Sequence, residues 1–426
     1  MWTATALLPV FLPALAAPVL GALAVLAALA GWDLLLLRHV RPVVCKRQLP
    51  ERAFVGRAGE VALQLHYDGA HAVELEIVDE LPGDLSATEP QFAAVTVAPG
   101  APVTVRYRIC PTVRGDRPMG PLIMLVHSPL GLFRRRCIER DAAVLRVYPD
   151  AAYFLRPEAL DPRRVFAALG VRPSPRRGDG MEFESLRDFV PGDDPRRIDW
   201  AAAARRGRLV TRLYQHERNH TVVVAIDASR LMASRVNGRS KLDHAIDAAL
   251  ALTYAALVSG DRASLMVFDN AVRAHLAPRR HRNHLGIFVD MLRTVQPRLV
   301  EANYRALLDN LTVWQRQRAL VVLLTDFVEV DAAQLIHPLA VLAQRHRVLV
   351  VAVRDAIYRG LDVCAPVEAD HLDLYRRLVL DDLLREREAA LAELRRRGVQ
   401  TLDLTPEAIT AAVLNRYLAV RYGPER

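Results

Sequence analysis

The chain has 426 residues, of which 52% are hydrophobic and 25% are charged, so it can build two or three domains with real cores and is not a disordered chain. The net charge is +9, from 57 Lys and Arg against 48 Asp and Glu. Acidic and basic residues are interleaved, which favours a salt-bridged surface over a nucleic-acid interface. The four cysteines lie far apart without metal-ligand spacing, which indicates neither a zinc site nor a disulfide framework.

Residues 1–37 form a hydrophobic membrane anchor in our interpretation, because Asp33 is their single acidic residue and they contain no Lys or Arg. One helix of this length would measure about 50 Å, more than the roughly 30 Å hydrocarbon core of a bilayer. We therefore expect two short passes, a transmembrane hairpin with its break near residues 17–21. A cleaved signal peptide is a weaker alternative, because a positive amino-terminal region is missing.

A basic cluster follows the apolar segment directly. By the positive-inside tendency, it predicts a protein of the bacterial inner (cytoplasmic) membrane with the bulk of the chain facing the cytoplasm. The cluster consists of Arg38, His39, Arg41, Lys46 and Arg47.

Residues 48–149 alternate apolar and polar side chains between Pro and Gly turns, which predicts a small β-sandwich. Clear examples are 61–67, 73–78 and 103–109. We expect this domain to serve in spacing, docking or self-association. Gly131-Leu-Phe133, followed by Arg134 to Arg136, would suit a membrane-surface or partner patch, but an ordinary hairpin is favoured.

Residues 150–215 are predicted to be a linker followed by a segment dense in Arg and Asp, which we call the motif segment. We expect a short helix over 181–190, ion pairs that order the segment, and a buried Trp200 that anchors it. A phosphate site or a partner-protein site is the alternative. The candidate residues are Glu182, Phe183, Arg187, Asp193, Asp194, Arg196, Asp199, Trp200 and Arg205.

Residues 216–426 alternate fully apolar strands with amphipathic helices, which is typical of a parallel sheet covered on both faces. Strands are expected at 221–226, 263–268, 319–324, 348–353 and 399–404. Helices are expected at 241–258, 285–295, 304–314, 332–345, 381–397 and 406–418. No glycine-rich phosphate loop follows a strand, so a bound dinucleotide or nucleoside triphosphate is not expected. No Gly-x-Ser-x-Gly turn is present either.

Two of these strands end in aspartates, Asp227 and Asp326. The carboxyl ends of strands in an open α/β sheet form the crevice where ligands bind, at the place where the strand order reverses. We therefore expect a binding face made by Asp227, Ser229, Arg230 and Asp326, with residues 182–200 packed beside it.

Several motifs carry a resemblance to a known family. They are Gly180-x-Glu-Phe-x-x-Leu-Arg-Asp-Phe-x-x-Gly-Asp-Asp-x-Arg-x-Ile-Asp-Trp200, Asp227-x-x-Arg230-x-Met232, Lys241-Leu-Asp-His, Gly260-Asp-Arg262 and Thr325-Asp326. The chain resembles the family called domain of unknown function 58. The resemblance implies a Rossmannoid domain like von Willebrand factor A. It also implies a partner, an AAA+ ATPase of the MoxR type.

Von Willebrand factor A domains hold a divalent cation on Asp-x-Ser-x-Ser, a threonine and a further aspartate. Asp227, Ser229 and Asp326 match three of these positions, so Mg²⁺ could bind at a degenerate site completed by Glu301 or Asn303. Leu231 stands at the second serine, and no threonine lies near 301–304. The alternative is a structural role, with the aspartates bound to backbone N–H groups or paired with Arg230 or Arg262. In that case we expect Arg230 between the two carboxylates.

The sequence therefore predicts a multidomain, non-enzymatic, membrane-anchored adaptor that binds proteins. One alternative is a metal-dependent enzyme resembling a phosphohydrolase, with Asp227 and Asp326 as metal ligands or as an acid/base pair; it lacks an evident nucleophile and a suitably placed histidine. The other alternative is a binder of anionic lipid or nucleic acid that uses the motif segment. Lys241 is expected only to begin a helix.

Overall fold

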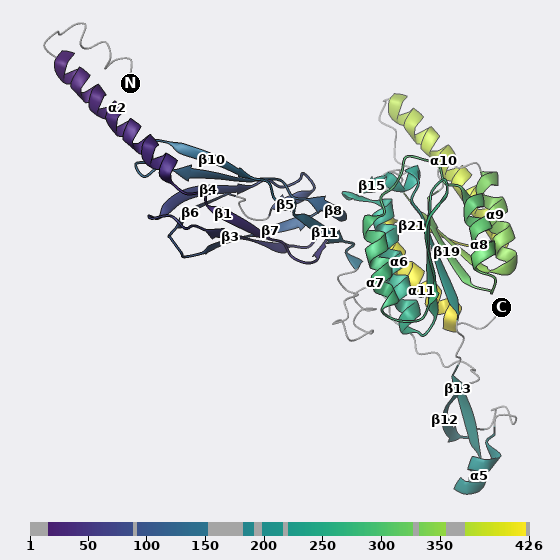
Figure 1. The fold of residues 1–426 in the computed structure, drawn as a ribbon. Helices are drawn as coiled ribbons and strands as arrows, with labels where there is room; N and C mark the ends of the chain where they lie inside the picture. Colours follow the sequence, from purple (N-terminus) through teal and green to yellow (C-terminus); the bar gives the residue numbers. More distant parts are fainter. Residues whose placement is uncertain are drawn as a thin grey trace. The chain divides into compact units, whose positions relative to one another are not determined.

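The computed structural model describes residues 16–87, 92–151, 182–190, 198–215, 220–326, 332–354 and 371–422 (Figure 1). The chain divides into two compact units, Met1–Val147 and Tyr148–Arg426.

The first unit begins with helix α2 (Ala16–His39). Its portion Pro18–His39 has 22 residues and a mean hydropathy of 2.2, which is long and apolar enough for a membrane anchor or a signal sequence. At 1.5 Å per residue it measures about 33 Å, close to the thickness of a hydrocarbon core. Residues 18–21, where a break was expected, are helical. The first pass expected before them lies outside the described residues.

The β-rich part of the first unit contains two four-stranded sheets, as the alternating pattern predicts. One has the strand order β1-β3-β7-β5 and the other β10-β9-β4-β6, and a smaller third sheet has the order β2-β11-β8. The bounds are β1 (Val44–Gln48), β2 (Ala53–Phe54), β3 (Gly59–His66), β4 (Val73–Asp79), β5 (Leu85–Ala87), β6 (Phe92–Val97), β7 (Val103–Pro111), β8 (Gly115–Pro118), β9 (Leu122–His127), β10 (Arg134–Glu139) and β11 (Val144–Tyr148). Alternate side chains of β3 and β4 are buried in one shared core.

A buried ion pair crosses this core between the two larger sheets. Arg47 of β1 donates two hydrogen bonds to Asp79 of β4, at 3.0 and 2.5 Å, and a third to the Gly120 carbonyl at 2.8 Å. The hydroxyl of Tyr107 on β7 donates to Asp79 at 2.5 Å. Burial and the hydrogen bond to Asp79 raise the pKa of Tyr107 above its usual value. The sequence reading placed Arg47 among the basic residues after the anchor, and the structure gives its side chain a place in the core.

In the second unit, a β-hairpin with a short helix carries the described part of the motif segment. It consists of β12 (Glu182–Asp188), α5 (Trp200–Arg206) and β13 (Val210–Gln215). The short helix expected over 181–190 is therefore wrong, because antiparallel pairing with β13 supplies the backbone hydrogen bonds of a strand and overrides local helix preference.

The expected burial of Trp200 is also wrong, since 67% of this residue is exposed. Trp200 is the first residue of α5, and the helix buries Ala202 and Ala203 instead. Asp199 caps the helix by accepting a hydrogen bond from the Ala202 N–H at 3.0 Å.

The rest of the second unit is a six-stranded sheet of order β18-β17-β14-β19-β20-β21. The strands are β14 (Thr221–Asp227), β17 (Arg262–Phe268), β18 (Val272–Arg279), β19 (Leu320–Thr325), β20 (Arg347–Val353) and β21 (Gln400–Leu404). All neighbours pair in parallel except β17 and β18. The five predicted strands are present, and β18 is an antiparallel edge strand that the pattern did not predict.

Helices cover both faces of this sheet (Figure 1). One face carries α6 (Lys241–Val258), α7 (His284–Thr294) and α11 (Ile409–Tyr422), and the other carries α8 (Tyr304–Trp314), α9 (Ala332–Arg345) and α10 (His371–Arg396). Three short 3₁₀ or strand elements, η3 (Arg230–Ala233), β15 (Arg235–Val236) and β16 (Arg239–Ser240), lie between β14 and α6, and η5 (Pro406–Ala408) precedes α11. Strands β14, β19 and β20 are almost wholly buried, which explains their uninterrupted apolar sequences.

Candidate functional site

The carboxyl ends of β14 and β19 lie side by side where the strand order reverses. From β14 the chain continues to β17 on one side, and β19 pairs with β14 on the other side. Asp227 ends β14, and Asp326 directly follows β19. The structure therefore brings the two predicted aspartates together at the switch point of the sheet, where open α/β sheets bind ligands.

Asp227 is fully buried and is held by hydrogen bonds from its neighbours. Its Oδ1 accepts from the Ser229 N–H at 2.8 Å, and its Oδ2 accepts from the Thr325 hydroxyl at 2.6 Å. The hydroxyl of Tyr304 lies 2.9 Å from that of Thr325. Burial raises the pKa of Asp227 to about 6, and the charge of Asp326 adds to this effect, while the hydrogen bonds from Thr325 and Ser229 oppose it.

Asp326 is also fully buried, and a cation contacts each of its oxygens. Lys241 Nζ lies 2.6 Å from Oδ2, and a terminal guanidinium nitrogen of Arg387 lies 2.7 Å from Oδ1. Lys241 is the first residue of α6, whose amino end is fixed by a capping box between Ser240 and Asp243. Lys241 thus begins a helix, as expected, and its side chain also neutralises the crevice.

The ion pairs continue to the far strand of the sheet. Arg387 contacts Oδ1 of Asp403 at 2.8 Å, and Arg354 contacts Oδ2 of the same carboxylate at 2.5 Å. Burial opposes ionisation of Asp403, but the hydrogen bonds from Arg387 and Arg354 hold its pKa below the usual value. The site thus contains three cations, Lys241, Arg354 and Arg387, for its three carboxylates.

This arrangement does not fit a divalent cation on Asp227, Ser229 and Asp326. Mg²⁺ requires oxygen ligands that point toward a common centre. Here both oxygens of Asp326 are taken by ammonium and guanidinium groups, and both oxygens of Asp227 accept hydrogen bonds. Within the described ranges, no cluster of three or more His, Cys, Asp and Glu side chains could hold a metal. Asn303, considered as an extra ligand, caps α8.

The expected pairing partners of the aspartates need correction. Arg230 is half exposed and lies 3.8 Å from Glu301, and Arg262 begins β17 at the opposite edge of the sheet. Lys241 and Arg387 take the place expected for Arg230. The reason is that α6, which carries Lys241, starts beside the switch point, and α10, which carries Arg387, passes beside it. Asp227, Ser229 and Asp326 are each at most 1% exposed, so of the four predicted face residues only Arg230 lies at the surface.

The described motif residues have local roles. Asp199 caps α5, Arg205 donates to the Ala201 carbonyl at 3.2 Å, and Arg208 pairs with Asp188 at 2.7 Å. Packing of this segment beside the crevice stays a prediction. Asp193, Asp194 and Arg196, and the side chains of Glu182, Phe183 and Arg187, lie outside the described residues.

The sequence reading missed Tyr304, Arg354, Arg387 and Asp403 as site residues. One signal was available for Arg387, because it lies on the helical stripe that also contains Ala390, Leu391 and Leu394, all buried. A charge on an apolar stripe requires a buried partner. Nothing local in the sequence identifies that partner.

An exposed surface lies beside this buried network, and we call it the rim: Arg230, Arg298, Leu299 and Glu301. Two backbone hydrogen bonds hold the rim to the end of β14, from Arg298 N–H to the Ala228 carbonyl at 2.8 Å and from Arg230 N–H to the Val300 carbonyl at 2.9 Å. Leu299 is 81% exposed, the largest fraction among the exposed large hydrophobic residues of the described chain. The rim therefore presents an apolar side chain between charges of both signs.

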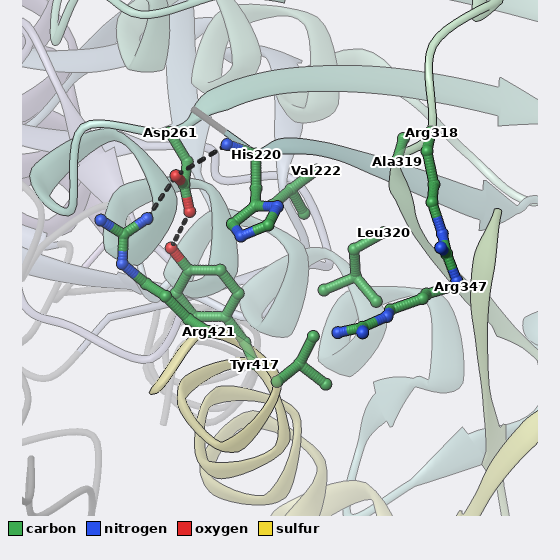
Figure 2. A pocket seen from close by; sticks show the side chains of 10 residues that line it. His220, Val222, Asp261, Arg318, Ala319, Leu320, Arg347, Tyr417 and Arg421 are labelled. Carbon is green, nitrogen blue, oxygen red and sulfur yellow. Dashed lines mark hydrogen bonds and ion pairs between the residues drawn. The ribbon is translucent and has the colours of Figure 1, made fainter. Parts of the chain in front are cut away.

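A pocket of about 220 Å³ lies at the opposite end of the sheet, where the parallel strands begin (Figure 2). On one wall Asp261 accepts hydrogen bonds from the Tyr417 hydroxyl at 2.6 Å and the His220 N–H at 3.2 Å, and it pairs with Arg421. These contacts fasten α11 to the start of β17. The pocket is thus separate from the switch point.

The chain contains an apolar helix and a β-rich part in its first unit, and its second unit contains an open α/β sheet whose switch point is internally neutralised. Residues 185–370 match the family described as "Protein of unknown function DUF58". The family recognised from the motifs is therefore confirmed over this part of the chain.

Uncharacterized proteins of Mycobacterium bovis and Mycobacterium tuberculosis are each 29% identical to this chain over 189 residues. The matched region is 44% of this chain and 58% of each mycobacterial protein.

Solved structures resemble parts of the chain weakly. A conserved hypothetical protein, BatB from Bacteroides thetaiotaomicron, is 15% identical with a TM-score of 0.32, over 47% of this chain and 99% of that one. The native alpha-2-macroglobulin of Escherichia coli is 19% identical with a TM-score of 0.21, over 26% of this chain and 17% of that one.

Proposed function

We propose that this chain is a non-enzymatic, membrane-anchored adaptor whose α/β domain is von Willebrand factor A-like and binds a protein through the rim. The first candidate partner is an AAA+ ATPase of the MoxR type, which the family resemblance implies. The adaptor sits in the bacterial inner membrane with its bulk on the cytoplasmic side. Helix α2 and the basic residues Arg38, His39 and Arg41 support this placement.

The observation that carries the proposal is the engagement of both Asp326 oxygens by Lys241 and Arg387. A site whose carboxylates are neutralised from within has no charge left to attract a metal or a small cationic ligand. It is a costly network to disturb, because removing one member would leave the buried charges unbalanced. At the carboxyl end of the sheet, a partner is then bound by the exposed rim.

The composition of the rim suits a protein partner. Leu299 offers an exposed apolar side chain, and Arg230, Arg298 and Glu301 surround it with charge. Interfaces typically combine an apolar centre with a polar border, and arginine is enriched in them. The phosphohydrolase alternative would need a carboxylate that is open to a metal or a water molecule, whereas Asp326 holds two cations.

The test is binding of the purified MoxR-type ATPase from the same genome to the full chain in lipid nanodiscs, with ATP or ADP. Replacing Leu299→Asp should weaken binding at least about tenfold, because it places a charge at the centre of the interface. Val313→Asp is the matched control. Val313 is 65% exposed and lies near the end of α8, at the opposite edge of the sheet.

Equal affinity of the wild type and Leu299→Asp would overturn the rim as the binding surface. Failure of the ATPase to bind under either nucleotide would overturn the candidate partner. Equal weakening by Leu299→Asp and Val313→Asp would show a general effect of added acidic charge.

A further inference from the structure

Asp33 of helix α2 holds the loop between β9 and β10. Its carboxylate accepts hydrogen bonds from the Ser128 hydroxyl at 2.5 Å, the Leu130 N–H at 2.9 Å and the Leu132 N–H at 3.2 Å. Asp33 is fully buried although it belongs to an otherwise apolar helix. The single acid of α2 is therefore a latch between the helix and this loop.

The loop itself is ordered by further hydrogen bonds. Ser128 N–H donates to the Phe133 carbonyl at 2.9 Å, and Phe133 N–H donates to the Ser128 hydroxyl at 3.0 Å. Gly131, at φ 74°, makes the turn at the tip, which a side chain would strain. On either side of this glycine, Leu130 and Leu132 are 54% and 57% exposed.

The latch places these two leucines beside α2, at a level before the carboxyl end of the helix. Asp33 precedes His39 by six residues, which corresponds to about 9 Å along a helix. Arg135 adds contacts from β10 to the end of α2, with hydrogen bonds to the Leu37 and Val40 carbonyls at 3.3 and 2.9 Å. The last residue of the apolar segment, Leu37, lies four residues after Asp33, so the loop tip is about one helical turn inside the end of that segment.

The residues around the loop tip are of the types found at membrane interfaces. Trp32 is 62% exposed on α2 directly before Asp33, and tryptophan is enriched where a helix leaves the hydrocarbon. Arg134 and Arg136 are exposed on β10 just beyond the loop, and Arg38 is exposed on α2. Two exposed leucines with basic residues behind them match the pattern of segments that insert shallowly among anionic lipid headgroups.

We propose that the loop 128–133 enters the lipid headgroup region beside α2 and forms a second membrane contact, with Asp33 as the latch that sets its depth. This proposal rests on the membrane anchoring in the proposed function. It assigns to Asp33 a role that an isolated acid in an apolar helix would otherwise lack. A second contact on the same compact unit would fix how the β-rich domain stands on the membrane.

The test uses the full chain in nanodiscs containing anionic lipid, with the photo-crosslinking residue p-benzoylphenylalanine at one position at a time. Position 132 is the probe. Position 25, where the native Val25 is 59% exposed on α2, is the positive control, and position 138, where Ile138 is 49% exposed on β10, is the matched control. Position 138 lies six residues along the chain from 132, about 20 Å in an extended strand. Lipid–peptide adducts are measured by mass spectrometry.

We expect the lipid adduct at position 132 to exceed that at 138 at least about fivefold, because shallow insertion reaches only about 5–10 Å below the surface. Adduct at 25 without excess at 132 would overturn the second contact and leave the anchor in place. Absence of adduct at both 25 and 132 would overturn the anchor itself. These outcomes separate the two proposals.

The latch has its own measurement. Asp33→Leu should speed hydrogen exchange of the Leu130 and Leu132 amides at least about tenfold, because both lose their acceptor. Amides of the paired strands β3 and β7 in the same sample report whether the domain remains folded. Unchanged exchange at Leu130 and Leu132 would overturn the latch.

Discussion

Lys241 Nζ lies 2.6 Å from Oδ2 of Asp326, and both side chains are almost completely buried. This lysine supplies the positive charge that the sequence analysis assigned to either Mg²⁺ or Arg230 at the switch point. The charge is supplied by the first residue of α6, which folding places there without a ligand. The charge of Asp326 is therefore balanced by side chains of the chain itself.

Replacing Lys241→Met should destabilise the α/β domain by about 3 kcal/mol, because it removes one partner of a buried ion pair while Arg387 still holds Asp326. The measurement is native-state hydrogen exchange of the β14 and β19 amides in the full chain. Lys46→Met is the control, since Lys46 is exposed and surface changes usually stay within about 0.5 kcal/mol.

The double variant Lys241→Met with Asp326→Asn should lower the free energy of unfolding by less than the sum of the decreases caused by the two single substitutions. In the double variant neither partner is left as an unpaired buried charge. Additive costs would show that the two side chains do not interact energetically.

The stability of the α/β domain should depend on the ionisation of Asp227. Burial raises the pKa of this carboxyl from 3.8 to about 6, so the native state binds the proton more tightly than the unfolded chain. The resulting stabilisation is fully present below about pH 4 and is lost as the pH rises through 6. At one pKa unit per 1.36 kcal/mol, the loss amounts to about 3 kcal/mol.

Asp227→Asn is the comparison for this dependence, because the amide keeps the shape and does not titrate. The difference in free energy of unfolding between the wild type and Asp227→Asn should therefore shift against the wild type between about pH 4 and pH 7 and then level off. Hydrogen exchange or denaturant titration at several pH values gives this difference. A constant difference across the range would contradict a raised pKa.

Trp200→Ala should change the free energy of unfolding by no more than about 0.5 kcal/mol, because the ring is exposed and its removal leaves no cavity. Val210→Ala is the contrast. Val210 is fully buried on β13, so its replacement by alanine should lower the free energy of unfolding by about 2 kcal/mol. Hydrogen exchange of the β12 and β13 amides measures the effect of both substitutions. A large effect of Trp200→Ala would mean that the Trp200 ring is packed against the protein in solution.

Tyr417→Phe should destabilise the attachment of α11 by about 1 to 3 kcal/mol, because Asp261 loses a buried hydrogen-bond donor. Asp261 keeps Arg421 and the His220 N–H, so the effect should be local to α11 and the start of β17. Hydrogen exchange of these two segments is the measurement.

Much of the fold could be predicted because the patterns are local. The uninterrupted apolar strands 221–226, 319–324 and 348–353 require burial on both faces, and strands buried between two helical layers are typical of a parallel sheet. Helices 241–258, 304–314 and 332–345 have the bounds that their periodicity predicts. The same argument put Asp227 and Asp326 at the carboxyl ends of parallel strands, and the structure adds that these two strands are neighbours.

Local patterns failed where a distant partner decided the outcome. Residues 182–188 form a strand because β13 pairs with them, and Trp200 is exposed because α5 buries two alanines instead. Arg47 was counted with the basic residues that flank a membrane, but Asp79 and Tyr107 draw it into the core.

The sequence by itself determined the order of an apolar helix, alternating strands and an α/β sheet, and it placed two carboxylates at the carboxyl edge of that sheet. Only the tertiary structure decided how those charges are neutralised. Asp227 and Asp326 are separated along the chain from Lys241, Arg387 and Asp403, and a buried charge takes whichever partner the packed helices bring within reach. The same holds for Asp33, whose role depends on a loop almost a hundred residues away.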